Sequence, residues 1–137
     1  MTPELKVLAL SALLQGLQFA VMSIRANLEL GPAITTSPRD PDRLPKPLME
    51  MVNVRTGRLF RAMNNHFEAL ILFTLAAVVV VLGDKTTGFS AICAWTYLAA
   101  RILYVPAYFY GWRPWRSFIW MTGFTATMLM IASALVM

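Results

Sequence analysis

Four strongly polar side chains recur at the start of an otherwise apolar segment. They are Arg58, Arg61, Asn65 and Glu68, and the apolar run that follows them continues to Leu82. In a helix, at about 100° per residue, the four fall on one face about 80° wide. Guanidinium groups bind carboxylates through parallel N–H donors, and a carboxylate pairs with an ammonium or with an arginine. The spacing therefore predicts a helix edge that can bind a ligand with several charged groups.

The apolar surroundings of these charges restrict what the helix edge can face. An unpaired ionised side chain at bilayer depth costs about 2.5 to 3.5 kcal/mol, so the edge must face protein or water. Two interpretations are open. Arg61, Asn65 and Glu68 either form an internal network of ion pairs and hydrogen bonds that fixes helix packing, or they bind a ligand.

The composition is typical of an integral membrane protein. Of the 137 residues, 58% are hydrophobic and 14% are charged, and the mean hydropathy is +0.59, which is too apolar for a soluble domain of this size. The net charge of +5 comes from basic residues beside apolar runs, which indicates membrane topology and not a nucleic-acid partner. Cys93 lies in an apolar segment and His66 is the one histidine, so neither a disulfide framework nor a metal site is expected.

The apolar runs predict four membrane-spanning helices that form one domain over residues 1–137. A helix of this kind needs about 20 apolar residues to cross the hydrocarbon layer. For the first run a cleaved signal peptide is the alternative, but Glu4 beside Lys6 and the polar residues inside the run favour a retained helix. The expected spans are residues 5–24, 58–82, 89–110 and 117–137, with a long proline-rich loop over 26–57.

The first predicted helix carries a polar edge of its own. Gln15 and Gln18 lie on this edge and are expected to form hydrogen bonds to other helices. Arg25 lies on the same edge, at the end of the helix that should meet Arg58. We therefore expect Arg25 to contact a ligand.

The third predicted helix has a second face that combines charge with tyrosine. Tyr97, Arg101, Tyr104 and Tyr108 fall on one narrow face. Tyrosines at a helix end are often part of an interfacial aromatic belt, and Tyr110 and Trp112 are expected to serve that purpose. A belt does not require tyrosines that share a face with an arginine, so Tyr104 and Tyr108 are candidate site residues.

Both patterns resemble a known family. Arg61-x-x-x-Asn65-x-x-Glu68 resembles the second-helix signature of the MAPEG family, the membrane-associated proteins in eicosanoid and glutathione metabolism, and Arg101-x-x-Tyr104-x-x-x-Tyr108 resembles its third-helix pattern. The resemblance implies a four-helix membrane bundle assembled as a homotrimer, with glutathione as co-substrate between subunits. It also implies a transferase or peroxidase that acts on a lipophilic electrophile or a lipid hydroperoxide from the membrane.

The resemblance also assigns catalytic residues. In the family an arginine near the start of the fourth helix stabilises the glutathione thiolate, in one branch with a serine directly after it, and Arg116 and Ser117 fit that pair. A thiol has a pKa of roughly 8.5, so a nearby guanidinium in a poorly hydrated cleft raises the thiolate population at neutral pH. Arg113 is the runner-up, although its position before Pro114 predicts that it faces lipid headgroups. The residues expected to bind glutathione are Arg25, Arg58, Arg61, Asn65, Glu68, Arg101, Tyr104, Tyr108 and Arg113.

The distribution of lysine and arginine predicts the orientation in the membrane. These residues concentrate in the long loop and in the turn at 111–117, whereas the N-terminus and the turn at 83–88 carry one each. The positive-inside rule then places both termini on the non-cytoplasmic side and the polar edges at the cytoplasmic side, in the inner membrane if the protein is bacterial.

Two other classes of function stay open at this point. A small proton-coupled multidrug transporter would also be a short four-helix chain with one membrane carboxylate. Such a transporter needs a titratable carboxylate near the middle of the membrane, whereas Glu68 lies near one end among arginines. A non-catalytic lipid-binding protein with the same fold is the second alternative.

Overall fold

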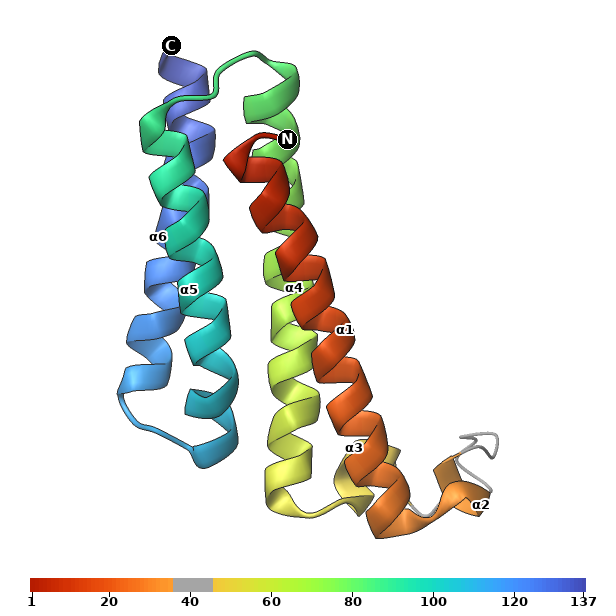
Figure 1. Cartoon of the computed structure of the whole chain (residues 1–137). Coiled ribbons are helices and arrows are strands. Elements are labelled where there is room, and N and C mark those ends of the chain that lie inside the picture. The colour runs from red at the N-terminus through yellow and green to blue at the C-terminus, as the bar shows by residue number, and fades with distance from the viewer. Residues whose placement is uncertain (36–45) are drawn as a thin grey trace.

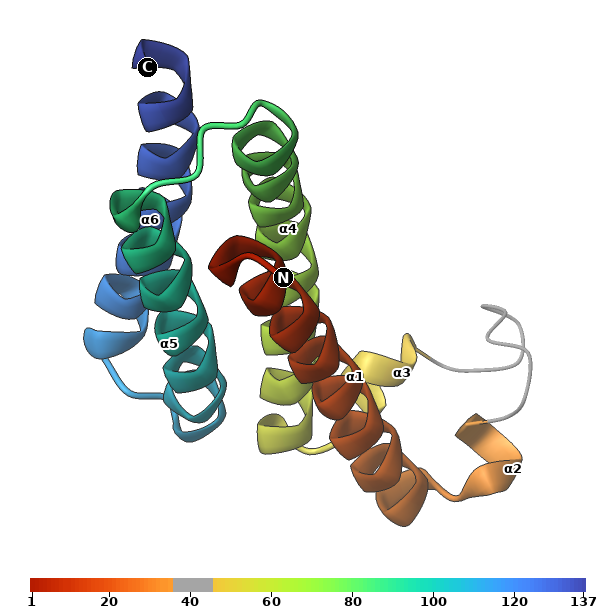
Figure 2. The same ribbon diagram turned by 45° about the horizontal axis from the view of Figure 1, so that its top comes forward.

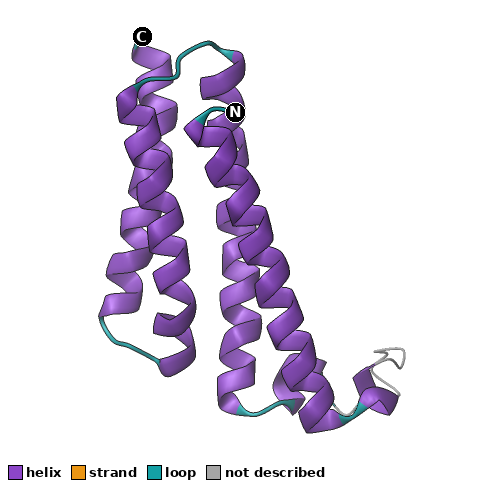
Figure 3. Ribbon diagram, viewed as in Figure 1, coloured by secondary structure: helices purple, strands orange, loops and turns teal. Residues whose placement is uncertain are grey.

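The computed structural model describes residues 1–35 and 46–137, and in these residues it contains helices and no strand (Figures 1 and 3). Within residues 1–35 and 46–137, four helices are long and apolar enough to cross a membrane. This confirms the prediction of an all-helical integral membrane protein that crosses the bilayer several times. The long helices are α1 (Pro3–Leu30), α4 (Val54–Leu82), α5 (Gly88–Tyr110) and α6 (Trp115–Val136), and the short ones are α2 (Pro32–Thr35) and α3 (Leu48–Met51).

The loop predicted over 26–57 is shorter than expected, because the helices on both sides extend into it. Helix α1 continues to Leu30, past the predicted end at residue 24, and α4 begins at Val54 instead of residue 58. Hydrocarbon thickness limits the apolar run but not the helix, which can continue through the headgroup layer with Arg25 in it. Leu30 is the last residue of α1. Gly31 caps the helix with φ of 87°, in a conformation that favours glycine, and Pro32 follows it. Residues 36–45 of the predicted loop lie outside the described residues.

The long helices form two closely packed pairs, α1 with α4 and α5 with α6 (Figures 1 and 2). Both termini lie at one end of the bundle, beside the turn between α4 and α5. At that end the Lys85 ammonium donates a hydrogen bond to the carbonyl oxygen of Met137 at 2.7 Å. The opposite end carries α2, α3 and the turn between α5 and α6. Side chains of the predicted polar edges contact one another across the helices, since Arg61 of α4 donates to Tyr108 of α5 and Arg101 of α5 donates to Asn65 of α4.

Two separate apolar clusters make up the core. The first lies toward the termini and is formed by α1, α4, α5 and α6, and the second lies toward the opposite end. Buried members of the first are Val7, Phe73, Ala76, Ala77, Val80, Cys93, Ala94, Tyr97, Leu98, Ala126 and Met130. Buried members of the second are Met22, Ala26, Leu59, Phe60 and Met63.

A buried polar layer separates these clusters along α1, α4 and α5. Its members are Gln15 and Gln18 on α1, His66 on α4 and Arg101 on α5, all at most 9% exposed. Nδ1 of His66 and Oε1 of Gln15 are 2.6 Å apart, which confirms the predicted interhelical role of Gln15. The same prediction is wrong for Gln18, because its amide donates to the carbonyl of Leu14 one turn earlier in its own helix.

The C-terminus of α5 depends on a glycine. Gly111 adopts φ of 70°, in the left-handed region, and the backbone N–H of Trp112 donates to the carbonyl of Ala107 at 2.8 Å. The Arg58 guanidinium from α4 covers this turn and donates to the carbonyl of Phe109 at 3.3 Å. A Cβ atom on Gly111 would lie 3.0 Å from Nη1 of Arg58. The turn and the position of Arg58 therefore depend on each other.

We predict that Gly111→Ala destabilises the protein by about 1–2 kcal/mol through the left-handed backbone alone, with a further cost from displacing Arg58. Thermal unfolding in detergent measures this change. Gly16→Ala is the matched control, because nothing lies within 4 Å of its added Cβ and alanine is favoured inside a helix. Equal unfolding temperatures for the two variants would contradict this account of the turn.

Candidate functional site

A cleft at the end of the bundle opposite the termini runs between α4 on one side and α5 and α6 on the other. It consists of three adjoining chambers, which follow one another along α4 from Arg58 toward Leu72. We call them the outer, middle and inner chambers. Together they contain ten of the eleven site residues predicted from the sequence.

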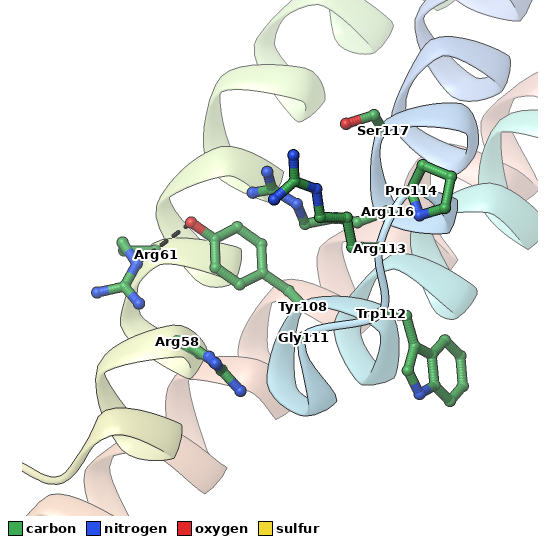
Figure 4. A pocket seen from close by; sticks show the side chains of 9 residues that line it. All are labelled: Arg58, Arg61, Tyr108, Gly111, Trp112, Arg113, Pro114, Arg116 and Ser117. Carbon is green, nitrogen blue, oxygen red and sulfur yellow. Dashed lines mark hydrogen bonds between the residues drawn. The ribbon is translucent and has the colours of Figure 1, made fainter.

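The outer chamber is large and strongly basic. Its volume is about 650 Å³, and Figure 4 shows the side chains of α4 on one side and those of the α5–α6 turn and α6 on the other. Among its lining residues four are arginines and none is acidic, so the chamber suits an anion. The lining residues are Arg58, Arg61, Tyr108, Gly111, Trp112, Arg113, Pro114, Arg116 and Ser117.

The middle chamber joins the outer one through Arg116 and Ser117, which line both. Its volume is about 370 Å³, and apolar side chains of α6 form part of its wall. A ligand group beside Arg116 and Ser117 would therefore meet polar surroundings on one side and apolar surroundings on the other. The lining residues are Asn65, Tyr104, Arg116, Ser117, Trp120 and Met121.

The inner chamber is the smallest, at about 110 Å³, and shares Asn65 and Trp120 with the middle one. Apolar groups dominate its wall, but the buried Arg101 and the exposed Glu68 also line it. Nη1 of Arg101 donates to Oδ1 of Asn65 at 3.0 Å. The lining residues are Asn65, Glu68, Ala69, Leu72, Tyr97, Arg101, Trp120, Gly123, Phe124 and Thr127.

Arginine and tyrosine side chains stack along the wall of the cleft. Cζ of Arg101 lies 4.3 Å from the ring centroid of Tyr104, whose ring meets that of Tyr108 edge to face at 5.6 Å. Cζ of Arg116 lies 4.8 Å from the Tyr108 centroid, and Nε of Arg61 donates to the Tyr108 hydroxyl at 3.2 Å (Figure 4). Contacts between cations and ring faces hold guanidinium groups in place while leaving donors at their edges for a ligand.

Arg113 differs from the sequence-based expectation that it faces lipid headgroups. It lines the outer chamber together with Arg116, and both side chains extend toward α4 in Figure 4. The reason is the left-handed Gly111, which turns the chain back over the cleft before Arg113. The preference of a residue before proline for extended backbone restricts φ and ψ, but it does not determine which way the turn faces.

Arg25 is the one predicted site residue that lines none of the three chambers in the described part of the chain. Its Nε donates to the hydroxyl of Thr56 at 3.0 Å, and its Cζ lies 5.2 Å from the ring centroid of Phe109. The Thr56 hydroxyl in turn donates to the carboxylate of Glu29. Within one chain, Arg25 connects α1 to the first turn of α4.

Several lining residues were not among the predicted site residues. Trp120 has a signal in the sequence, because it lies one helical turn after Arg116 and so shares its face. Tyr97 shares the narrow face predicted for Arg101, Tyr104 and Tyr108, although the site prediction does not include it. Leu72, Met121 and Phe124 have no such signal, since apolar residues occupy every face of these helices.

The fold and the cleft define a class: a helical membrane protein with a basic cleft between its helices at one end. A model of the MAPEG family matches residues 7–136, nearly the whole chain, so the protein belongs to the MAPEG family, which includes glutathione-dependent transferases and peroxidases. Comparisons with curated proteins and with solved structures give no match.

Proposed function

We propose that the protein is a glutathione transferase or peroxidase of the membrane, which binds glutathione in the cleft and uses its thiolate on a lipophilic electrophile or a lipid hydroperoxide. The observation that carries this proposal is the position of Arg116 and Ser117, which form the wall shared by the outer and middle chambers. A thiolate held there has the basic chamber on one side and Trp120 and Met121 on the other. A charged peptide and a lipophilic molecule can therefore meet at one point.

The charges of the cleft complement those of glutathione, which carries two carboxylates, an ammonium and a thiol. The arginines of the outer chamber suit a carboxylate, and Arg58, Arg61 and Arg113 are available there. The ammonium of the peptide suits Glu68, which is exposed on the inner chamber. This charge arrangement supports an enzyme over a small multidrug transporter, for which four arginines around the chamber have no evident use.

The role proposed for Arg116 is to stabilise the thiolate. A guanidinium beside the sulfur favours the ionised form, and the Ser117 hydroxyl can donate a hydrogen bond to it. In the transferase reaction the sulfur bonds to an electrophilic carbon, which loses its leaving group or, in an addition, passes the electron pair to a neighbouring atom that takes up a proton. In the peroxidase reaction the sulfur takes the terminal oxygen as the O–O bond breaks, so that glutathione becomes a sulfenic acid and the alkoxide takes up a proton and leaves as an alcohol. A second glutathione then converts the sulfenic acid to a disulfide and water. Both reactions suit a detoxifying enzyme that collects its second substrate from the membrane.

We further propose that the protein assembles as a homotrimer in the inner or cell membrane, with both termini on the non-cytoplasmic side. The cleft then opens toward the cytoplasmic glutathione pool. Family membership supports the trimer. Arg25 lines none of the three chambers of its own chain, and in a trimer its remaining guanidinium donors would be the part that reaches a neighbouring subunit.

Glutathione should bind to the purified protein, and Arg61→Ala should weaken its affinity more than tenfold, because removing one partner of a charge-assisted contact costs about 1.5–3 kcal/mol. Isothermal titration calorimetry measures this affinity. The same peptide with alanine in place of cysteine separates binding of the charged groups from binding of the thiol. Arg55→Ala is the control, because this exposed arginine lies at the same end and lines none of the three described chambers. Equal affinities of the two variants for glutathione would mean that Arg61 has a structural role and does not bind the peptide.

Replacing Arg116 by leucine should raise the pKa of bound glutathione, because the positive charge that favours the thiolate is lost. The ultraviolet absorbance of the thiolate near neutral pH should then fall while the peptide still binds. Arg113→Leu should weaken binding and leave the thiolate absorbance of the bound peptide unchanged. If the thiolate absorbance falls only in the Arg113 variant, Arg113 is the residue that stabilises the thiolate. If it falls in neither variant, neither arginine stabilises the thiolate.

The mass of the purified protein in detergent or in native lipid tests the assembly. We expect three times the mass of one chain, 15.3 kDa, after correction for bound detergent and lipid. A preparation that binds glutathione but contains only monomers or dimers would contradict the trimer.

A further inference from the structure

A methionine side chain borders the place assigned to the sulfur of glutathione. Met121 lines the middle chamber together with Arg116 and Ser117, and it is 55% exposed. It follows Ser117 by four residues in α6, so the two side chains lie on one face of that helix, one turn apart. Met121 also lines an apolar groove of about 540 Å³ between α5 and α6. Its side chain is therefore accessible both from the cleft and from the surface that faces lipid.

The other methionines are placed differently. Among the described residues, Met121 is the one methionine that lines a chamber of the cleft. Three others are at most 7% exposed, namely Met22, Met63 and Met130. Met128 lies on α6 as Met121 does, is partly exposed, and lines neither the chambers nor the groove. It is therefore the reference for a thioether on the same helix without the polar groups of the cleft beside it.

We propose that Met121 is an oxidation site: when glutathione is absent, a hydroperoxide that enters the middle chamber converts the Met121 thioether to the sulfoxide. This assignment rests on the proposed function, in its peroxidase form. The thioether and the glutathione thiolate are both sulfur nucleophiles that border one chamber, so they compete for the same terminal oxygen. The thiolate reacts faster, and the thioether is oxidised only when no thiolate is bound.

The oxidation transfers one oxygen atom and two electrons. The sulfur of Met121 forms a bond to the terminal oxygen of the hydroperoxide as the O–O bond breaks. The sulfur is oxidised to the sulfoxide, and the hydroperoxide is reduced to an alkoxide. The proton of the terminal oxygen passes to the alkoxide, which leaves as an alcohol. Arg116 and Ser117 favour this step, because a guanidinium and a hydroxyl stabilise the negative charge that develops on the departing oxygen.

The sulfoxide changes the wall of the middle chamber. Methionine sulfoxide is polar, whereas the thioether that it replaces is apolar. The lipophilic second substrate then binds more weakly, while the arginines of the outer chamber are unchanged. Because reductases reverse this modification, Met121 makes the activity of the enzyme depend on the supply of glutathione.

The first test measures the rate of oxidation at each methionine. The purified protein in liposomes, without glutathione, is treated with cumene hydroperoxide, and peptide mass spectrometry detects the added oxygen atom. Met121 should be oxidised at least about tenfold faster than Met128, and Arg116→Leu should remove most of this difference by slowing Met121 alone. The unchanged rate at Met128 then shows that the variant is folded. Glutathione, at a constant concentration of hydroperoxide, should protect Met121 and leave the rate at Met128 unchanged.

The second test measures the effect on activity. Met121→Leu and Met128→Leu each replace a thioether on α6 by an apolar side chain of similar volume, so they form a matched pair. After treatment with the hydroperoxide, wild type and Met128→Leu should show a raised KM for the lipophilic substrate. Met121→Leu should keep the KM that it had before treatment.

Three results would overturn the assignment. They are equal rates of oxidation at Met121 and Met128, a rate at Met121 that Arg116→Leu leaves unchanged, and a KM of Met121→Leu that rises as much as that of wild type. The first two would mean that Met121 is oxidised through exposure alone. A wild-type protein that reduces no hydroperoxide with glutathione would overturn the proposed peroxidase, whichever methionine is oxidised. Glutathione-dependent reduction without the predicted selectivity overturns only the role of Met121.

Discussion

The guanidinium of Arg101 is the group around which the rest of the structure is arranged. A charge at this depth must be surrounded by polar or aromatic partners from the protein, because lipid offers none. Asn65 from α4 supplies an acceptor and the ring of Tyr104 supplies a face, so that one side chain joins the two helix pairs. The same requirement explains why a polar layer interrupts the core between its two apolar clusters.

The lining of the cleft changes from polar to apolar along its length. Arginines dominate where the cleft opens at the end of the bundle, and apolar side chains of α6 take over where it runs toward the middle. Tyr104 and Tyr108 lie along this gradient: the ring of each contacts a guanidinium, and the two rings meet edge to face. This gradient is what the proposed function requires, because a charged molecule from water and an apolar molecule from the bilayer would then approach one point without either crossing an unfavourable medium.

The sequence was sufficient for the features that depend on helical periodicity. The shared face of Arg58, Arg61 and Asn65 follows from spacing alone, and the structure places these side chains along one cleft. The direction of Arg113 could not be predicted in this way, because it depends on a left-handed turn at Gly111 and not on any periodic element.

The positions of the helix ends and of the chambers could not be predicted from the sequence, for other reasons. Apolar content marks where a helix lies in hydrocarbon, so it gave no signal that α1 continues to Leu30. The chambers depend on how three helices diverge, which is a property of packing. The pairing of Arg101 with Asn65 is of the same kind, because two residues on different helices carry no mark of their contact.

The buried charge on α5 also has a consequence for how the protein enters the membrane. Arg101 lies well inside helix α5, which is one of the four helices long and apolar enough to cross a membrane. On insertion scales an arginine at the centre of a helix opposes entry by about 2.5–3.5 kcal/mol. Helix α6 follows after a short turn and packs closely on α5. Helix α4, which precedes α5 in the chain, supplies the acceptor Asn65. We therefore expect α5 to enter the bilayer together with its two neighbours and not as a single helix.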